Sequence, residues 1–211
     1  MITLQIDDKE IKAEQGANLL QVCLDNEIYI PNLCHINGME HPPASCRLCF
    51  VEIDGFPNPV TSCTTNVKDG MIVKTDTPAV RDLQKSSFQL LMSTHDVACK
   101  ECPADKKCDL IKIAKFLKVA LKQPKNLGKR LKEVAIDTRH PHFDLHLNRC
   151  VLCGRCIYIC QKEHGKAYLT FAKRGIDTVI SHYAESDSSK TECDGCRSCI
   201  DICPVKAITE K

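Results

Sequence analysis

The sequence predicts an α+β protein built from three small domains, at residues 1–77, 78–135 and 136–211. The first range holds short alternating apolar segments, such as ITLQI at residues 2–6, which are typical of strands. The second holds two stretches with helical apolar periodicity. The third holds one cysteine pattern twice, on either side of a hairpin pattern. Strand and helix patterns are both present, and the predicted class is therefore α+β.

Charge and hydropathy exclude several kinds of partner. A net charge of +2 over 211 residues provides no global attraction to nucleic acid or to an anionic membrane. No apolar stretch approaches the roughly 18 residues that a membrane-spanning helix needs. The opening residues, MITLQIDDKE, lack the basic and apolar regions of a secretory signal. We therefore expect a soluble cytoplasmic protein with no nucleic-acid partner and no membrane span.

Cysteine usage is the strongest compositional signal. The chain has 16 cysteines, no tryptophan and an aromatic content of only 5%. In a reducing compartment, such cysteines are expected to hold metal as thiolates and not to form disulfides. Bound metal would then replace part of the usual hydrophobic core, so we expect the chain to fold poorly without it.

Two cysteine runs near the C-terminal end share the spacing C-x2-C-x2-C-x3-C. They are Cys150, Cys153, Cys156 and Cys160, and then Cys193, Cys196, Cys199 and Cys203, which Pro204 follows. This repeat is typical of two cubane [4Fe–4S] clusters, in which the fourth cysteine of each run ligates the other cluster. The predicted ligand sets are Cys150, Cys153, Cys156 and Cys203 for one cubane, and Cys160, Cys193, Cys196 and Cys199 for the other.

Zinc and disulfides are the alternatives to this interpretation. Tetrahedral zinc sites are usually built from two well-separated cysteine pairs and not from two compact runs of four. Disulfide frameworks belong mainly to short secreted chains. Both alternatives are therefore less favoured than the paired cubanes.

The N-terminal range begins with a hairpin pattern and a short helix. Residues 2–6 and 10–13 alternate on either side of a polar turn, and FVEI and MIVKT supply further strands. Leu19, Leu20, Cys23 and Leu24 share one helical face. Cys23 is therefore interpreted as a small core residue and not as a ligand.

Four further cysteines have the spacing expected of a [2Fe–2S] site. They are Cys34, Cys46, Cys49 and Cys63, separated by 11, 2 and 13 residues. Four thiolates suit a rhombic cluster with two ligands on each iron. The spacing differs from the plant-type C-x4-C-x2-C pattern.

The segments IYIPNLCH, ASCRLCFVEIDG and TSCTT resemble the N-terminal [2Fe–2S] domain of the large iron–sulfur subunit of respiratory NADH dehydrogenase. They also resemble its relatives in NAD(P)-linked or electron-bifurcating hydrogenases, the diaphorase or iron–sulfur subunits, and this hydrogenase-linked group is the preferred identification. The resemblance implies a β-grasp ferredoxin fold for residues 1–77. One departure is Ala44, where relatives usually carry glycine two residues before the second ligand. This predicts a slightly altered loop with the ligand intact.

The middle range is expected to be a small helical domain. Asp76 or Thr77 caps a helix that has Pro78 in its first turn. Its apolar positions are Val80, Leu83, Phe88, Leu91 and Met92. The helix leads directly to a site of mixed ligand type.

That site consists of one histidine and three cysteines: His95, Cys99, Cys102 and Cys108. The pattern resembles the His-ligated [4Fe–4S] site of the same family. A lone histidine is more often structural, but every other cysteine except Cys23 already has an assignment, so the three cysteines lack a fourth partner. His95 is therefore the predicted fourth ligand. Because imidazole is neutral, such a cluster should be easier to reduce than one with four thiolates.

A basic helix is predicted at residues 109–123, with a lysine stripe on one face. Leu110, Ile113, Ala114, Leu117, Ala120 and Leu121 are expected to face inward, and Lys112, Lys115, Lys118 and Lys122 outward. The common explanation for such a stripe is a solvated face. The functional alternative is a docking surface for an acidic partner such as ferredoxin.

The last range connects its two cysteine runs through a hairpin. Residues 124–128 form a break, and AIDTRHPHFDL then resembles the family segment that leads into the first cubane run. YLTFAK and DTVIS flank Arg174–Gly175 as a hairpin, and ESDSSKTE returns the chain to Cys193. The resulting domain is expected to be a two-cluster, bacterial-ferredoxin-like unit.

The sequence contains no recognisable catalytic machinery. All candidate ligands are assigned to clusters, and the nine glycines include no G-x-G that could form a dinucleotide or phosphate loop. The chain ends eight residues after Cys203, and we expect no catalytic domain within it. One [2Fe–2S] and three [4Fe–4S] clusters would instead make a conductor for single electrons.

The sequence predicts an electron-transfer subunit, which carries electrons between the other subunits of an oxidoreductase complex. The resemblance implies a flavin subunit that oxidises NAD(P)H as one partner, and a hydrogenase or other catalytic subunit, or ferredoxin, as the other. Alternatives within this class are formate dehydrogenase, transhydrogenase and quinone-reducing complexes. From other classes, a free polyferredoxin shuttle and a cluster-based redox sensor stay open.

Overall fold

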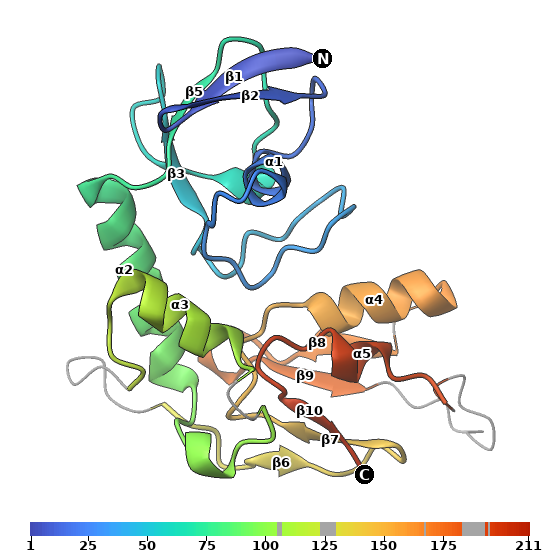
Figure 1. Ribbon diagram of the computed structural model, residues 1–211. Helices are drawn as coiled ribbons and strands as arrows, with labels where there is room; N and C mark the ends of the chain where they lie inside the picture. The colour runs from blue at the N-terminus through green and yellow to red at the C-terminus, as the bar shows by residue number, and fades with distance from the viewer. Residues whose placement is uncertain (105–106, 123–129, 167, 183–192, 194) are drawn as a thin grey trace. The chain divides into compact units, whose positions relative to one another are not determined.

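The computed structural model describes the chain except residues 105–106, 123–129, 167, 183–192 and 194 (Figure 1). The chain forms two compact units, which are Met1–Leu90 with Ile113–Ala120, and Leu91–Lys112 with Leu121–Lys211. Two of the three dividing points fall inside helices α2 (Pro78–Thr94) and α3 (Asp109–Leu117), and the third follows α3, between Ala120 and Leu121. The three domains predicted from the sequence are a different division, and they stay a prediction.

The first unit is built on a mixed five-stranded sheet. Its strands, in spatial order, are β2 (Lys9–Ala13), β1 (Ile2–Ile6), β5 (Ile72–Lys74), β3 (Phe50–Ile53) and β4 (Val60–Thr61). β1 pairs with β2 as the predicted antiparallel hairpin, with Ile2 opposite Ala13. β1 pairs with β5 in parallel, and the remaining pairs are antiparallel. A mixed sheet of this order with a helix against it is the expected β-grasp arrangement.

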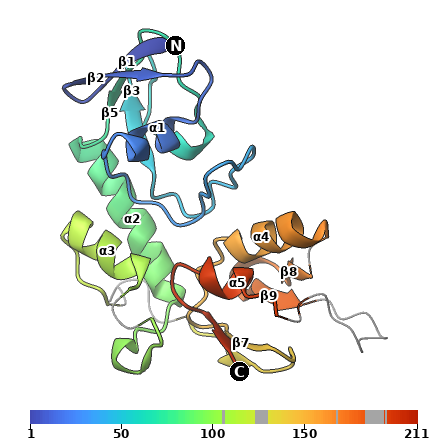
Figure 2. The same cartoon turned by 45° about the vertical axis from the view of Figure 1, so that its right-hand side comes forward.

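Helix α1 (Leu19–Asp25) closes the core of this unit and lies beside the sheet (Figure 2). Asn18 caps it, because its side-chain oxygen accepts a hydrogen bond from the Gln21 N–H at 3.2 Å. Cys23 is completely buried in the core cluster, as predicted. Burial, with a smaller contribution from Asp7, raises the pKa of its thiol to about 12. Cys23 is therefore a neutral apolar residue at physiological pH.

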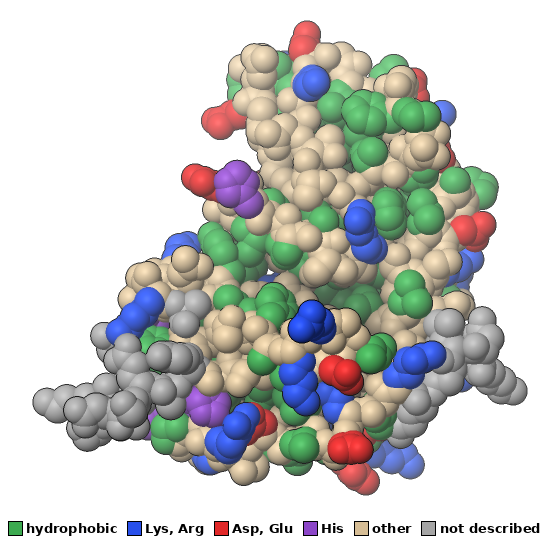
Figure 3. All heavy atoms as spheres, turned by 180° about the vertical axis from the view of Figure 1, so that it is seen from behind, with side chains coloured by type: hydrophobic (Ala, Val, Ile, Leu, Met, Phe, Trp, Pro, Cys, Tyr) green, Lys and Arg blue, Asp and Glu red, His purple; other side chains and the backbone are tan. Residues whose placement is uncertain are grey.

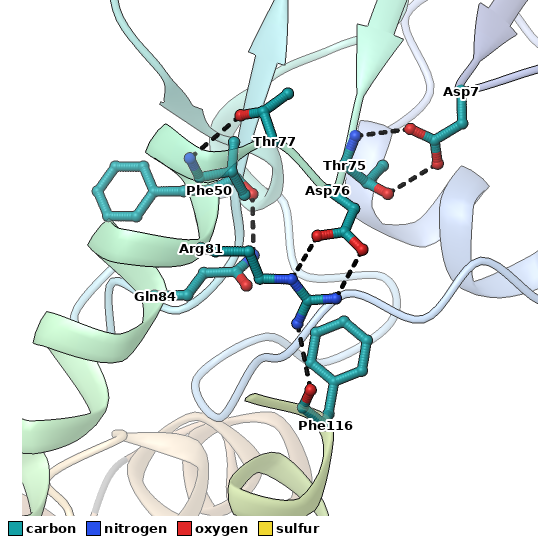
Figure 4. Close-up of polar contacts among 9 residues, drawn as sticks. Asp7, Phe50, Thr75, Asp76, Thr77, Arg81, Gln84 and Phe116 are labelled. Atoms are coloured by element: carbon teal, nitrogen blue, oxygen red, sulfur yellow. Dashed lines mark hydrogen bonds and ion pairs between the residues drawn. The ribbon is translucent and has the colours of Figure 1, made fainter. Parts of the chain in front are cut away.

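Thr77 caps helix α2, and a small polar network anchors its first turns (Figure 4). The Thr77 hydroxyl accepts a hydrogen bond from the Val80 N–H at 3.2 Å. The Arg81 guanidinium donates to the Asp76 carboxylate at 2.8 Å and to the Phe116 carbonyl at 3.2 Å. Its central carbon also lies 4.1 Å from the centroid of the Phe116 ring, a cation–π geometry. The beginning of α2 is thereby fixed to the end of α3.

The predicted apolar face of α2 is partly wrong. Val80, Phe88 and Met92 are buried, but Leu83 is 37% exposed and Leu91 is half-buried. The buried residues recur at intervals of four, so the inward face includes Gln84 and excludes Leu83. Gln84 can be buried because its side-chain N–H donates to the Phe50 carbonyl at 3.2 Å.

Helix α3 ends at Leu117, earlier than the predicted limit of residue 123. Lys118 adopts a left-handed φ of 54°, its N–H donates to the Lys115 carbonyl, and the Val119 N–H donates to the Ala114 carbonyl. These two bonds form a Schellman C-cap, with lysine where glycine is usual. Ala120 is consequently exposed, although the periodicity predicted that it faces inward. The four lysines of the stripe are exposed as predicted.

The second unit combines small sheets with short helices. A three-stranded antiparallel sheet has the order β10 (Ile208–Glu210), β7 (Phe143–His146), β6 (Ile136–Asp137). β8 (Leu169–Ala172) and β9 (Val179–His182) form the predicted hairpin. The helices are α4 (Arg155–His164) and α5 (Ser198–Asp201). The predicted break at residues 124–128 and the run ESDSSKTE lie outside the described residues.

Membrane insertion has no support among the helices that the structure describes. None of them is both long enough and apolar enough to cross a bilayer.

Candidate cluster sites

The four cysteines of the predicted [2Fe–2S] site converge in the interior of the first unit. Cys34, Cys46, Cys49 and Cys63 are each at most 4% exposed. The Sγ atoms of Cys34 and Cys46 are 3.5 Å apart. The Ser62 N–H and hydroxyl both donate to the Cys49 carbonyl, at 2.9 and 2.8 Å, and the Asn18 side chain donates to the Cys63 carbonyl at 2.6 Å. Hydrogen bonds to the backbone thus hold two of the ligand-bearing loops.

Mutual hydrogen bonding couples these thiols. Hydrogen bonds with Cys46 and Cys63 lower the pKa of the Cys34 thiol well below its usual value. The same bond and then burial raise the pKa of Cys46. A hydrogen bond with Cys63 lowers the pKa of Cys49. The four sulfur atoms therefore lie within reach of one another, as ligands of a single rhombic cluster would have to.

The loop around Cys46 uses left-handed backbone conformations. Ala44 has φ 49° and Arg47 has φ 53°. The backbone therefore adopts, with alanine, a conformation that glycine would adopt without strain. Ala44 therefore occupies a position whose backbone conformation favours glycine, which is the residue that the resemblance leads us to expect there.

The mixed histidine–cysteine site lies in the second unit. His95, Cys99, Cys102 and Cys108 line one cavity, together with apolar side chains that include Leu110 and Val205. His95 immediately follows α2. Cys99 begins a short 3-10 turn (Cys99–Glu101), and Cys108 immediately precedes α3. Cys99 is exposed, and the other two cysteines are half-buried.

A hydrogen bond fixes the orientation of His95. Its Nδ1 lies 3.0 Å from the carbonyl oxygen of Arg149, so this nitrogen carries the proton and donates. The other ring nitrogen, Nε2, then carries the lone pair that a metal requires. Burial lowers the pKa of His95, which further favours the neutral, ligating form.

A second cavity is lined by the first predicted cubane set. Cys150, Cys153, Cys156 and Cys203 surround it, with Leu145, Ile180 and Val205 among the apolar neighbours. Burial raises the pKa of Cys150 to about 12, and the neighbouring Cys153 and Cys203 add to the shift. Cys203, from the far end of the chain, therefore lies beside the cysteines of the first run.

A third and larger cavity, of about 470 Å³, is lined by the other predicted set. These residues are Cys160, Cys193, Cys196 and Cys199. Burial raises the pKa of Cys199 to about 12, and Cys160 is the first neighbouring thiol that adds to the shift. Four histidines also line the cavity: His140, His142, His164 and His182.

The donors around these cavities fit iron–sulfur clusters. Across the described residues, no group of His, Cys, Asp or Glu side chains is arranged to hold a single metal ion. Backbone amides approach sulfur atoms of the paired sets, with Leu152 N at 3.4 Å from Cys150 Sγ, Tyr168 N at 3.4 Å from Cys160 Sγ, and Ala207 N at 3.2 Å from Cys203 Sγ. Cysteine ligands whose sulfur atoms accept N–H···S bonds are the environment that iron–sulfur clusters use.

The two cubane loops share a backbone feature that only one of them reveals in sequence. Leu152 has φ 53° and Gly195 has φ 74°, each at the second position after the first cysteine of its run. Glycine indicates this conformation, whereas leucine does not. Sequence reasoning also missed Arg149 and Val205, which act through a backbone carbonyl and through packing. It missed Asn18 because the partner of its side chain, the Cys63 carbonyl, is distant in sequence.

Two family models match parts of the chain. Residues 1–78 match the family described as 2Fe-2S iron-sulfur cluster binding domain, and residues 140–209 match NADH-quinone oxidoreductase subunit 3, ferredoxin-like domain. The fold and these matches thus define a protein built from an iron–sulfur-binding domain and a ferredoxin-like domain.

More particularly, the chain is similar to a subunit of NADH-ubiquinone oxidoreductase and to a subunit of an NADP-reducing hydrogenase. It is 30% identical to the NADH-ubiquinone oxidoreductase 78 kDa subunit, mitochondrial, of Neurospora crassa, with 100% of this chain and 28% of that protein covered. It is 28% identical to NADP-reducing hydrogenase subunit HndD of Solidesulfovibrio fructosivorans, with 100% and 36% covered. The chain therefore spans only about a quarter to a third of these curated relatives.

A solved structure matches over nearly its full length. A chain of NAD+-reducing [NiFe]-hydrogenase, in the H2-reduced state, has a TM-score of 0.82 and 27% identity to this chain. The match covers 100% of this chain and 87% of that chain. The predicted resemblance to hydrogenase-linked subunits is thereby confirmed.

Proposed function

We propose that the chain holds one [2Fe–2S] and three [4Fe–4S] clusters and conducts single electrons within an NAD(P)-linked oxidoreductase complex. The proposed ligands are Cys34, Cys46, Cys49 and Cys63 for the rhomb; His95, Cys99, Cys102 and Cys108 for one cubane; and, for the paired cubanes, Cys150, Cys153, Cys156 and Cys203, and Cys160, Cys193, Cys196 and Cys199. When bound, iron–sulfur clusters accept and release electrons. The observation that carries the proposal is that three separate cavities of the second unit are each lined by one complete cubane set.

Shared residues support an arrangement of the three proposed cubane sites in a row. Val205 lines both the His95 cavity and the Cys150 cavity. Helix α4 carries Cys156 of the Cys150 set and, one turn later, Cys160 of the next set. The site built around Cys150 would therefore be the middle one, and electrons crossing this unit would pass through it.

Two of the proposed partners follow from the relatives. We infer a flavin subunit that exchanges electrons with NAD(P)H on one side and a hydrogenase-type catalytic subunit on the other. The likeness of the whole chain to a chain of NAD+-reducing hydrogenase supports this choice, and the similarity to NADH-ubiquinone oxidoreductase supports a quinone-reducing complex as the second candidate.

Ferredoxin is a further proposed partner, at the His95 site. Cys99 is exposed, and no other of the 16 cysteines, all within the described residues, is exposed. The exposed Lys100, Lys107 and Lys112 lie close to it in sequence. Lys and Arg side chains are interspersed with acidic and apolar ones on the face that Figure 3 shows, so any attraction for an acidic protein would be local.

Anaerobic purification of the native protein tests the proposal. The expected content is about fourteen iron atoms per chain, two from the rhomb and twelve from three cubanes, with matching sulfide. Co-purification with a flavoprotein is expected. A reproducible content near ten irons would remove one cubane from the proposal, and a monomer that exchanges electrons with several unrelated enzymes would establish a shuttle instead.

A further inference from the structure

Arg149 joins two of the proposed cubane sites through its main chain. Its carbonyl oxygen accepts the hydrogen bond from His95 Nδ1 at 3.0 Å, and the next residue in the chain is Cys150. The carbonyl of the preceding residue, Asn148, accepts a hydrogen bond from the Asp96 N–H at 2.7 Å. Asn148 and Arg149 thus hold the residues around His95 in place, and Cys150 is itself a proposed ligand of the neighbouring site.

The side chain of Arg149 returns to the His95 site. One guanidinium nitrogen, Nη2, lies 3.4 Å from the carbonyl oxygen of Glu101, in the turn between Cys99 and Cys102. The other, Nη1, lies 3.2 Å from Nδ1 of His146. Because guanidinium nitrogens can only donate, His146 accepts through Nδ1, and its Nε2–H is left to donate to the Thr209 hydroxyl at 3.1 Å.

Neighbouring bonds hold this segment in place. The buried Asn148 side chain accepts from the Lys132 N–H at 2.8 Å and donates to the Lys132 carbonyl at 3.1 Å. The Arg149 N–H donates to the His146 carbonyl at 3.0 Å. The guanidinium is therefore a positive charge with a fixed direction and not a freely moving surface arginine.

We propose that Arg149 is a positioning residue that sets the reduction potential of the His95 site. Its carbonyl orients the imidazole, and its guanidinium places a permanent positive charge against the turn that carries Cys99 and Cys102. The inference depends on the proposed cluster at that site.

The sign of the effect follows from charge. Reduction adds one electron to the cluster, and a fixed positive charge nearby stabilises the more negative, reduced form. Arg149 and the neutral imidazole of His95 therefore act in the same direction, and both make this site easier to reduce. Removing the guanidinium should lower the midpoint potential.

Redox-titrated electron paramagnetic resonance of the full chain tests this, with iron content measured in parallel. Arg149→Met removes the charge and keeps a similar length, and Arg149→Lys keeps the charge on a more flexible stem. We expect the midpoint potential of the His95 site to fall in Arg149→Met and to recover most of the loss in Arg149→Lys. Arg174→Met, which removes an exposed arginine from the β8–β9 turn, is the matched control and should leave that potential unchanged.

Each outcome separates the role of Arg149 from the existence of the cluster. An unchanged potential in Arg149→Met with full iron content overturns the inference, as does a fall of equal size in Arg149→Lys. If Arg149→Met does not assemble the site, Arg149→Gln, which is neutral but can still donate a hydrogen bond, is judged by the same criterion. Absence of the His95-site signal from the unmodified protein would instead refute the proposed cluster.

Discussion

The Sγ atom of Cys34 lies 3.5 Å from the Sγ atom of Cys46, although eleven residues separate the two in sequence. Cys23 is equally buried, but it packs among the apolar side chains in the hydrophobic core of the first unit. Burial alone therefore does not distinguish a ligand from a core cysteine. The groups that contact the sulfur atom make this distinction.

The first prediction contrasts these two cysteines. Cys23→Ala should keep the full [2Fe–2S] content and cost about 1 kcal/mol of stability, because only one buried sulfur atom is lost. Cys34→Ala should abolish the rhombic signal, because one iron loses a thiolate. Absorption and paramagnetic resonance spectra of the two variants provide the measurement. Loss of the signal in Cys23→Ala would contradict the ligand assignment of this domain.

The second prediction concerns the strained loop before Cys46. Ala44 has φ 49°, which costs an L-residue about 1–2 kcal/mol, and glycine removes that cost while losing some chain entropy. Ala44→Gly should therefore raise the free energy of unfolding by roughly 0.5–1 kcal/mol. Denaturant unfolding of the cluster-loaded protein measures it. Ala13→Gly, in strand β2, is the control and should destabilise by a similar amount; equal destabilisation by both changes would show that the loop is unstrained.

The first unit shows how far sequence patterns reach. Alternation predicted the β1–β2 hairpin, and Thr77 with Pro78 marked the start of α2, because these signals are local. The length of α3 was mispredicted because Lys118 takes the left-handed position of a C-cap, which nothing in its side chain indicates. Gln84 was missed as a buried residue because its partner, the Phe50 carbonyl, is distant in sequence.

The candidate sites likewise have some features that the sequence predicts and others that it does not. Cysteine spacing predicted which thiols to group, because ligand spacing follows from cluster geometry. Spacing could not reveal Arg149 or Val205, whose contributions are a backbone carbonyl and a shared cavity wall. Support of this kind depends on tertiary contacts and leaves no periodicity in the chain.

The third prediction is an acid sensitivity centred on His140. This side chain is 6% exposed, stacks on Phe143 with ring centroids 3.6 Å apart, and accepts a hydrogen bond from the His142 N–H at 3.2 Å. Burial first, and then the charges of His182, His142 and Lys211, lower the pKa of His140 to about 4, against an opposing effect of Asp137. The folded protein therefore resists protonation of a group that the unfolded chain protonates readily.

The sign of the pH dependence follows from this difference. Stability from a neutral His140 is complete above about pH 6.5 and is lost as the pH falls toward about 4, with a slope of at most about 1.4 kcal/mol per pH unit. His140→Gln, which can still accept the His142 bond but cannot ionise, should flatten this part of the profile. Urea unfolding between about pH 7.5 and 4.5 is the measurement. An unchanged slope in His140→Gln would assign the acid sensitivity to other groups.

The last prediction concerns His95, the one proposed ligand that is not a cysteine. His95→Ala leaves one corner of a cubane open to water or an external thiol, so about four iron atoms should become labile while the other sites keep theirs. His95→Cys should retain the cluster with one more negative charge among its ligands, and its midpoint potential should fall because that charge favours the oxidised state. His41→Ala, at an exposed histidine of the first unit, is the matched control and should change neither iron content nor potential. Iron analysis and redox-titrated paramagnetic resonance decide the matter. Full iron content and unaltered potentials in both His95 variants would mean that the hydrogen bond to Arg149 serves only to fix the end of α2, and that Cys99, Cys102 and Cys108 take their fourth partner from elsewhere.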